Sequence, residues 1–103
     1  MSWWFKGYLI VFSRDAQKDL DRLDLVISSR INEKISLLTQ SPDNLDIKKL
    51  AGQLKTRYRL RCGDYRVIFD VCDEKIVITI IMVGHRSGVY YRLERVSNVK
   101  KNK

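Results

Sequence analysis

The chain has 103 residues, of which 45% are hydrophobic and 31% are charged, so its length suits one domain and its composition excludes wholesale disorder. Its 20 lysines and arginines against 12 acidic residues give a net charge of +8, which favours a polyanion or an acidic protein as partner. The apolar run 76–83 is far shorter than the ~20 residues that span a bilayer, and the N-terminus lacks a signal-peptide cleavage site. We therefore expect a single domain, 1–103, that is cytoplasmic and has no membrane partner.

The N-terminal part of the chain predicts a strand followed by two helices. Residues 4–12 are aromatic and β-branched, as in a strand. Ser13 is suited to cap a helix and Asp15 to occupy its first turn. Helical spacing continues past a break near Asp24 until Pro42 stops it. We expect a helical hairpin whose apolar stripes face the core: Ala16, Leu20, Leu23, Ile27, Ile31, Ile35 and Leu38.

From residue 56 onward the pattern predicts three strands. Tyr58, Leu60 and Cys62 alternate with three arginines, which gives one apolar and one basic face. Residues 62–64 and 72–75 have turn composition, and the strands between and after them span 65–71 and 76–83. The last strand is apolar on both faces and therefore interior. The turns are too short for crossovers, so the strands should be antiparallel.

These elements predict an α+β fold in the order β-α-α-β-β-β. We expect a four-stranded antiparallel sheet with an N-terminal helical hairpin. The segment after Arg92 is at most a short helix that frays into a flexible basic tail, 93–103. Cys62 and Cys72 lack metal-binding or disulfide spacing and should be reduced packing residues.

Cationic side chains gather around the predicted hairpins. Arg57, Arg59 and Arg61 share one strand, Arg66 opens the next, and Arg86 follows the third. Because strand ends converge in an antiparallel meander, these guanidiniums are expected to share a concave surface. Such a cluster is unfavourable without an anion among its members. The alternative is a solvated basic face with ion pairs to residues such as Asp64 or Glu94.

Histidine and tyrosine complete the groups with usable chemistry. His85 is the only histidine and cannot hold a metal alone, so it is either a strand-end surface residue or a proton-transfer group. Tyr90 or Tyr91 is suited to stack on a base or to transfer a proton. Walker, GxGxxG, nucleophile-elbow and HExxH motifs are absent from the sequence. Arginine, histidine and tyrosine suffice, without metal or other cofactor, for attack of an RNA 2′-hydroxyl on its own phosphodiester.

The segments LTQSP, DIKKLAG, YRLRCGDYRVIFDV and VGHRSGVYY, in this order, resemble the RelE/ParE superfamily of bacterial toxins, its RelE-like branch in particular. The resemblance runs from about Phe5 to Tyr91. It implies a toxin that cleaves messenger RNA in the ribosomal A site and that a cognate antitoxin holds inactive in a hetero-oligomer.

The resemblance also implies roles for individual residues. The arginine of the family's G-Y-R element falls on Arg66, the arginine after V-G-H on Arg86, and the tyrosine of the terminal E-V-Y on Tyr90. These are the phosphate-stabilising, leaving-group and substrate-orienting positions. Two lysines of RelE-like enzymes fall on Arg57 and Arg59, a departure that matters because a guanidinium is a poor general base.

His85 is therefore expected to act as the general base. A second departure is that Ser87-Gly88 replaces the Arg-Glu pair common in the family. The predicted catalytic residues are Arg66, Arg86, Tyr90 and His85, and the predicted substrate-binding residues are Arg57, Arg59 and Arg61. The alternatives are a ParE-like inhibitor of DNA gyrase, or a degenerate toxin that only binds antitoxin or RNA. A gyrase binder has no use for the catalytic set, which favours the nuclease.

Overall fold

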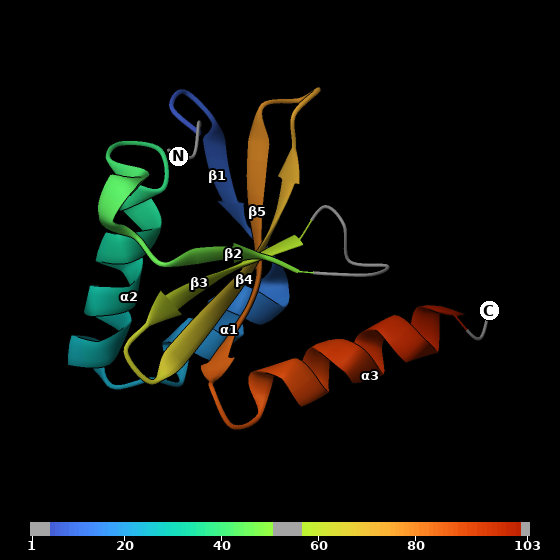
Figure 1. Cartoon of the computed structure of the whole chain (residues 1–103). Coiled ribbons are helices and arrows are strands. Elements are labelled where there is room, and N and C mark those ends of the chain that lie inside the picture. Colours follow the sequence, from blue (N-terminus) through green and yellow to red (C-terminus); the bar gives the residue numbers. More distant parts are fainter. Residues whose placement is uncertain (1–4, 51–56, 102–103) are drawn as a thin grey trace.

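The computed structural model describes residues 5–50 and 57–101, with the side chains placed up to Arg95 (Figure 1). No helix of these residues is long and apolar enough to span a membrane. The elements are β1 (Leu9–Phe12), α1 (Arg14–Asp21), α2 (Leu25–Leu37), a 3₁₀ turn (Pro42–Asn44), β2 (Ile47–Lys49), β3 (Arg57–Cys62), β4 (Tyr65–Cys72), β5 (Val77–His85) and α3 (Val89–Lys101).

The predicted α+β class is confirmed, but the predicted four-stranded antiparallel sheet is wrong. The sheet is mixed and has five strands in the order β1-β5-β4-β3-β2. Strand β1 runs parallel to β5, with Leu9 opposite Val77 and Phe12 opposite Ile80. The meander β3-β4-β5 is antiparallel as predicted, and β2, which was not predicted, joins β3 at its edge, also antiparallel. The parallel pairing is possible because β1 and β5 are joined by most of the chain rather than by a tight turn.

Two elements account for the rest of the difference. Strand β2 has only three residues, two of them lysines, so it lacks the apolar alternation that identifies a strand. Helix α3 begins at Val89 and has 13 residues, whereas the prediction allowed at most a short helix after Arg92. Val89 and Leu93 are buried four residues apart, and this apolar pair anchors the first turns of the helix on the sheet.

The N-terminal helices begin where the sequence predicts. The Ser13 hydroxyl accepts a hydrogen bond from the backbone N–H of Ala16 at 3.0 Å and donates one to the carbonyl of Ile81 at 2.8 Å. It therefore caps α1 and ties the helix start to β5. Helix α2 begins after Asp24, which confirms the predicted break.

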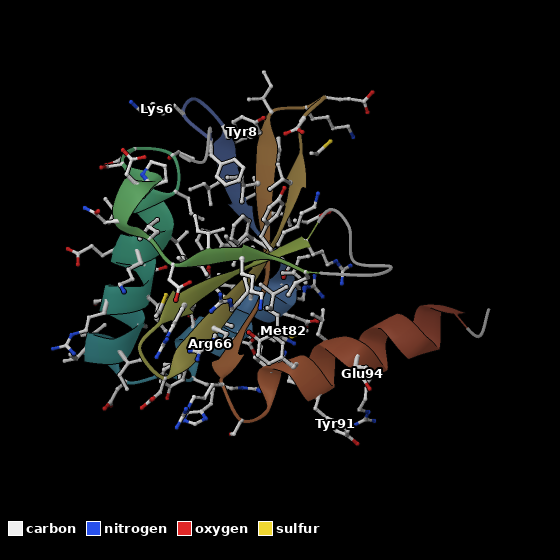
Figure 2. The ribbon with its side chains drawn as sticks, in the orientation of Figure 1. Lys6, Tyr8, Arg66, Met82, Tyr91 and Glu94 are labelled. Atoms are coloured by element: carbon white, nitrogen blue, oxygen red, sulfur yellow. The ribbon has the colours of Figure 1, made fainter. Side chains whose placement is uncertain are left out.

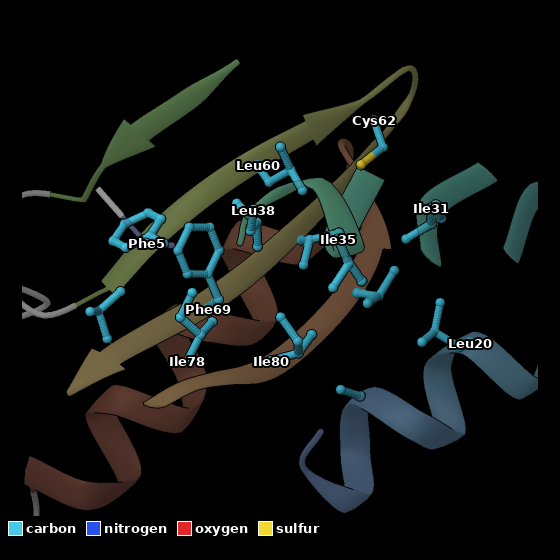
Figure 3. Packing of buried hydrophobic residues seen from close by; sticks show 14 residues of the cluster. Phe5, Leu20, Ile31, Ile35, Leu38, Leu60, Cys62, Phe69, Ile78 and Ile80 are labelled. Atoms are coloured by element: carbon cyan, nitrogen blue, oxygen red, sulfur yellow. The ribbon is translucent and has the colours of Figure 1, made fainter. Parts of the chain in front are cut away.

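Helices cover the sheet on both faces. The larger core lies between the sheet and α1 and α2, where Leu20, Ile35 and Leu60 meet Phe69 and Ile80 (Figure 3). The smaller core joins Ile68 and Met82 to Val89 and Leu93 of α3 on the opposite face. Figure 1 shows α3 leading away from the end of β5. The end of β3, the start of β4 and the end of β5 lie at one side of the sheet, where α3 begins shortly after β5.

Candidate functional site

A cleft of about 780 Å³ lies where β2, the β3–β4 hairpin and the end of β5 meet the first turn of α3. Its lining is cationic and contains one histidine and one tyrosine. The residues that line it are Lys48, Lys49, Leu50, Arg59, Arg66, His85, Arg86, Ser87 and Tyr90.

The cleft brings together all four residues predicted to be catalytic and one predicted to bind substrate. Arg66, His85, Arg86 and Tyr90 line it together with Arg59. Arg57 and Arg61, the other two arginines of β3, do not. Arg57 lies at the opposite end of β3, across from Asp70, and the exposed side chain of Arg61 faces Asp46.

Arg66 is the most rigidly held cation of the cleft. It projects from β4 beside the β3–β4 hairpin (Figure 2) and is only 9% exposed. Its Nη1 group donates to the carbonyl of Gly63 at 2.8 Å and to that of Tyr65 at 3.0 Å. A guanidinium has five N–H donors, so these bonds fix the side chain while Nε and Nη2 keep their N–H groups for a ligand. The burial of Arg66 disagrees with the alternative of a solvated basic face at this position.

The β3–β4 turn also places Arg86. Gly63 adopts a positive φ of 60°, which glycine does without strain and which permits the tight turn. The backbone carbonyl of Asp64 then accepts a hydrogen bond at 2.8 Å from the backbone N–H of Arg86. The Arg86 side chain is 62% exposed and lies 3.7 Å from an Asp64 carboxylate oxygen. Such an exposed, long contact is weak, so the guanidinium can turn toward an anion in the cleft.

His85 is oriented by its neighbours on both sides. Its ring meets that of Tyr65 edge to face, with the centroids 5.6 Å apart. Its Nδ1 atom lies 2.8 Å from the Ser87 hydroxyl oxygen and accepts from the Ser87 backbone N–H at 3.2 Å. Because the backbone N–H can only donate, the neutral ring in this arrangement carries its proton on Nε2. His85 is thus a hydrogen-bond donor at Nε2 unless Ser87 changes its bonding.

The position of Tyr90 at the cleft depends on how the first turns of α3 pack against the sheet. A Cβ atom at Gly84 would come within 3.2 Å of the Val89 Cβ atom, so the glycine allows the helix to approach β5 closely. Asp19 of α1 accepts hydrogen bonds from the backbone N–H of Val83 at 2.9 Å and from Arg92 at 3.2 Å. These contacts hold the first turns of α3 against the sheet, with Tyr90 40% exposed at the cleft.

Asp46 qualifies the expectation that the β3 arginines repel one another. One of its carboxylate oxygens lies 3.2 Å from Arg59 Nη2, and the other lies 3.9 Å from Arg61 Nη1. The Arg59 side chain is 12% exposed, so this contact fixes its direction at the cleft wall. The predicted basic face is therefore partly neutralised by an acidic residue that precedes β2.

Lys48 and Lys49 are cleft residues that the sequence analysis did not identify. They stand in the segment DIKKLAG, which supports the family resemblance. Because the sequence did not predict β2, it did not indicate that these lysines lie beside Arg59. Their position within a family segment was the available signal.

The described residues contain no group of three or more His, Cys, Asp or Glu side chains arranged to hold a metal ion. The chemistry that the cleft residues themselves offer is stabilisation of an anion by guanidiniums, with proton transfer at an imidazole or a phenol. A phosphodiester matches this set, because arginine forms bidentate hydrogen bonds with phosphate, as it also does with carboxylate.

Comparison with known proteins agrees with this chemistry. Residues 10–90 match the family described as ParE toxin of type II toxin-antitoxin system, parDE. The chain is 31% identical over 87 residues to the mRNA interferase toxin RelE of Escherichia coli, covering 82% of this chain and 90% of the relative. It is 27% identical over 86 residues to the toxin RelG of Mycobacterium tuberculosis, covering 82% and 98%.

Solved structures show the same similarity. The archaeal RelE–RelB complex from Pyrococcus horikoshii contains a chain with a TM-score of 0.66 and 30% identity, over 80% of this chain and 98% of that one. The isolated E. coli RelE toxin has a TM-score of 0.65 and 27% identity, over 90% and 99%. The protein belongs to the RelE/ParE superfamily, the toxins of type II toxin–antitoxin systems.

Proposed function

We propose that the protein is the toxin of a type II toxin–antitoxin pair and an endoribonuclease that cleaves messenger RNA in the ribosomal A site. The observation that carries the proposal is the convergence of Arg66, Arg86, His85 and Tyr90 in one cleft. The name of the E. coli relative, mRNA interferase toxin RelE, supports it.

In the proposed reaction the RNA supplies the nucleophile. The 2′-oxygen bonds to the adjacent phosphorus and the bond from phosphorus to the 5′-oxygen breaks, which leaves a 2′,3′-cyclic phosphate and a 5′-hydroxyl. Arg66 and Arg86 donate to the nonbridging oxygens and so stabilise the charge of the pentavalent phosphorane. Arg86 also stabilises charge on the departing 5′-oxygen, which takes its proton from water. Tyr90 stacks against a nucleotide base and aligns the attack.

His85 accepts the proton of the 2′-hydroxyl in this scheme. Acceptance at Nε2 requires the other tautomer, in which Nδ1–H donates to the Ser87 hydroxyl oxygen. The hydroxyl can reverse its role, whereas the backbone N–H of Ser87 must give up its 3.2 Å contact. Losing that contact costs about one hydrogen bond, ~1 kcal/mol. Ser87 thereby orients the ring in both states.

The partners follow from the same proposal. Structures of similar toxins are RelB–RelE antitoxin–toxin complexes, and we infer that this chain is also held inactive by a cognate antitoxin. The net charge of +8 favours an acidic antitoxin segment lying across the basic side of β3. A ribosome-dependent activity places the protein in the cytoplasm.

A second candidate is inhibition of DNA gyrase, because the matched family carries the ParE name. The two functions differ in what they require of the cleft. A nuclease depends on Arg66 and Arg86, whereas a toxin that acts by protein binding retains no need for them.

The distinguishing experiment adds purified protein to a translating extract and maps mRNA 5′ ends. The nuclease predicts new 5′ ends within codons being translated, and their loss with the double change Arg66→Ala, Arg86→Ala. A gyrase supercoiling assay runs in parallel with the same two proteins. Intact mRNA together with inhibited gyrase would overturn the nuclease in favour of the second candidate.

A further inference from the structure

Lys48 stands directly opposite Arg59 in the antiparallel pair of β2 with β3. Directly opposed residues project from the same face of a sheet, with their Cβ atoms about 5 Å apart. Leu50, two residues after Lys48 and just past the end of β2, packs against the core beneath α3, which places Lys48 on that face as well. Lys48 and Arg59 both line the cleft.

Two cations in directly opposed positions destabilise a strand pair unless an anion lies between them. Arg59 has its partner in Asp46. The ion pairs found among the described residues include none with Lys48. The Lys48 ammonium group therefore adds an uncompensated charge to a cleft that also contains Arg66 and Arg86.

The pair Lys48–Arg59 lies apart from the pair Arg66–Arg86. Arg59 pairs with Ile68 of β4, and Arg66 lies two residues before Ile68. With strands ~4.8 Å apart and a rise of ~3.3 Å per residue, the Cα atoms of Arg59 and Arg66 are about 8 Å apart. The two pairs are therefore rooted at different points along the cleft, which allows each pair to contact its own phosphate.

We propose that Lys48 and Arg59 form a second phosphate subsite, which binds the backbone phosphate next to the scissile one. The inference rests on the proposed function, because it assumes RNA in the cleft. Arg59 is a fixed arm of the subsite, since its side chain is 12% exposed and tied to Asp46. Lys48 is an adaptable point charge, as lysine commonly is at phosphates.

An acidic protein segment could also meet these cations, but RNA is the better match. The subsite is continuous with the cleft that holds the candidate catalytic groups. It presents cations about one backbone step from Arg66, and only a polymer with regularly spaced anions uses both pairs at once. An acidic segment is therefore an outcome that the experiment must distinguish.

The first arm of the test measures binding of an uncleavable, 2′-O-methylated RNA across a range of salt concentrations. Lys48→Met is compared with Lys75→Met, a matched loss of one charge on the exposed β4–β5 turn. We expect Lys48→Met to weaken binding about two- to fivefold and to reduce the slope of log affinity against log salt by about 0.7. Lys48→Arg should restore most of the affinity and most of the salt dependence. Equal affinities and equal salt slopes for Lys48→Met and Lys75→Met would overturn the proposed subsite.

The second arm identifies the phosphate by making single phosphates neutral methylphosphonates. One position next to the scissile phosphate should weaken binding to the wild-type protein more than binding to Lys48→Met, because the variant has already lost one of its two contacts with that phosphate and keeps only Arg59. Equal losses for both proteins at every position would contradict the proposal. So would a Lys48→Met variant that binds RNA normally but loses antitoxin affinity. Failure of the nuclease itself appears separately, as uncleaved mRNA with the wild-type protein.

Discussion

Arg66 links the stability of the fold to the activity of the cleft, so its removal should affect both. Arg66→Ala deletes the two hydrogen bonds to the carbonyls of Gly63 and Tyr65. At ~1 kcal/mol for each bond, we expect a loss of about 2 kcal/mol in the free energy of unfolding. For a domain of this size that lowers the Tm by roughly 8–16 °C. The protein should still fold, since small domains have about 5–15 kcal/mol of stability.

The same change removes a preorganised cation from the reacting phosphate. By analogy with oxyanion-hole donors, cleavage on ribosomes should slow by on the order of 10²-fold or more. Arg86→Ala is the informative comparison, because the Arg86 side chain is 62% exposed. It should lose a similar factor in rate with a change in stability within about 0.5 kcal/mol, and the toxin should still bind antitoxin.

The assay pairs thermal unfolding, followed by circular dichroism, with single-turnover cleavage at a temperature where every variant is folded. Arg22→Ala, an exposed arginine at the end of α1, is the matched control and should change neither quantity. An unaltered cleavage rate in Arg66→Ala would refute its catalytic role. An unaltered Tm would refute the structural role of its two hydrogen bonds.

Three further predictions concern the thiols, metal ions and His85. Burial raises the pKa of the Cys62 thiol from 9.0 to about 11, opposed by the nearby charges of Lys34 and Arg66. The resulting stabilisation is fully present below pH 9 and is lost as the pH rises toward 11, by up to about 3 kcal/mol. Cys62→Ala should remove that part of the alkaline loss, and iodoacetamide at pH 8 should modify Cys72 before Cys62. EDTA should leave cleavage intact on ribosomes stabilised without excess free magnesium, and abolished cleavage there would contradict a metal-free reaction. His85→Gln should flatten the acidic limb of the pH–rate profile, whereas an unchanged limb would return His85 to a strand-end surface role.

Local signals in the sequence predicted the elements that follow local rules. The cap at Ser13, the break at Asp24 and the alternation along β3 depend on neighbouring residues, and each is present in the structure. Strand β2 depends on long-range pairing with β3. Three residues with two lysines carry no pattern that marks them as a strand.

The direction of β1 is also set by distant partners. The sequence identifies a strand near Phe12 but not the neighbour it joins, and β1 pairs with β5, about seventy residues later in the chain. Parallel pairing then follows from a connection that runs through both N-terminal helices. For α3, the buried pair Val89 and Leu93 was visible in the sequence, but two apolar residues indicate a helix only when a surface to cover is known.

For the candidate site, the family segments predicted the residues at the strand ends but not their surroundings. Arg66, His85, Arg86 and Tyr90 meet in one cleft. The pairing of Asp46 with Arg59 and the bonding of Ser87 to His85 required coordinates, because both depend on side-chain directions. Lys48 joined the site only through the register of β2 with β3.

In the proposed reaction the cleft cleaves messenger RNA through the 2′-hydroxyl of the substrate itself. The most direct measurement uses ribosomes programmed with a synthetic mRNA in which only the nucleotide 5′ to the mapped cleavage position lacks its 2′-hydroxyl. We expect the wild-type protein to cleave the all-ribose message, leaving a 2′,3′-cyclic phosphate, and to leave the deoxy-substituted message intact at that position. Cleavage of both messages at equal rates would contradict it.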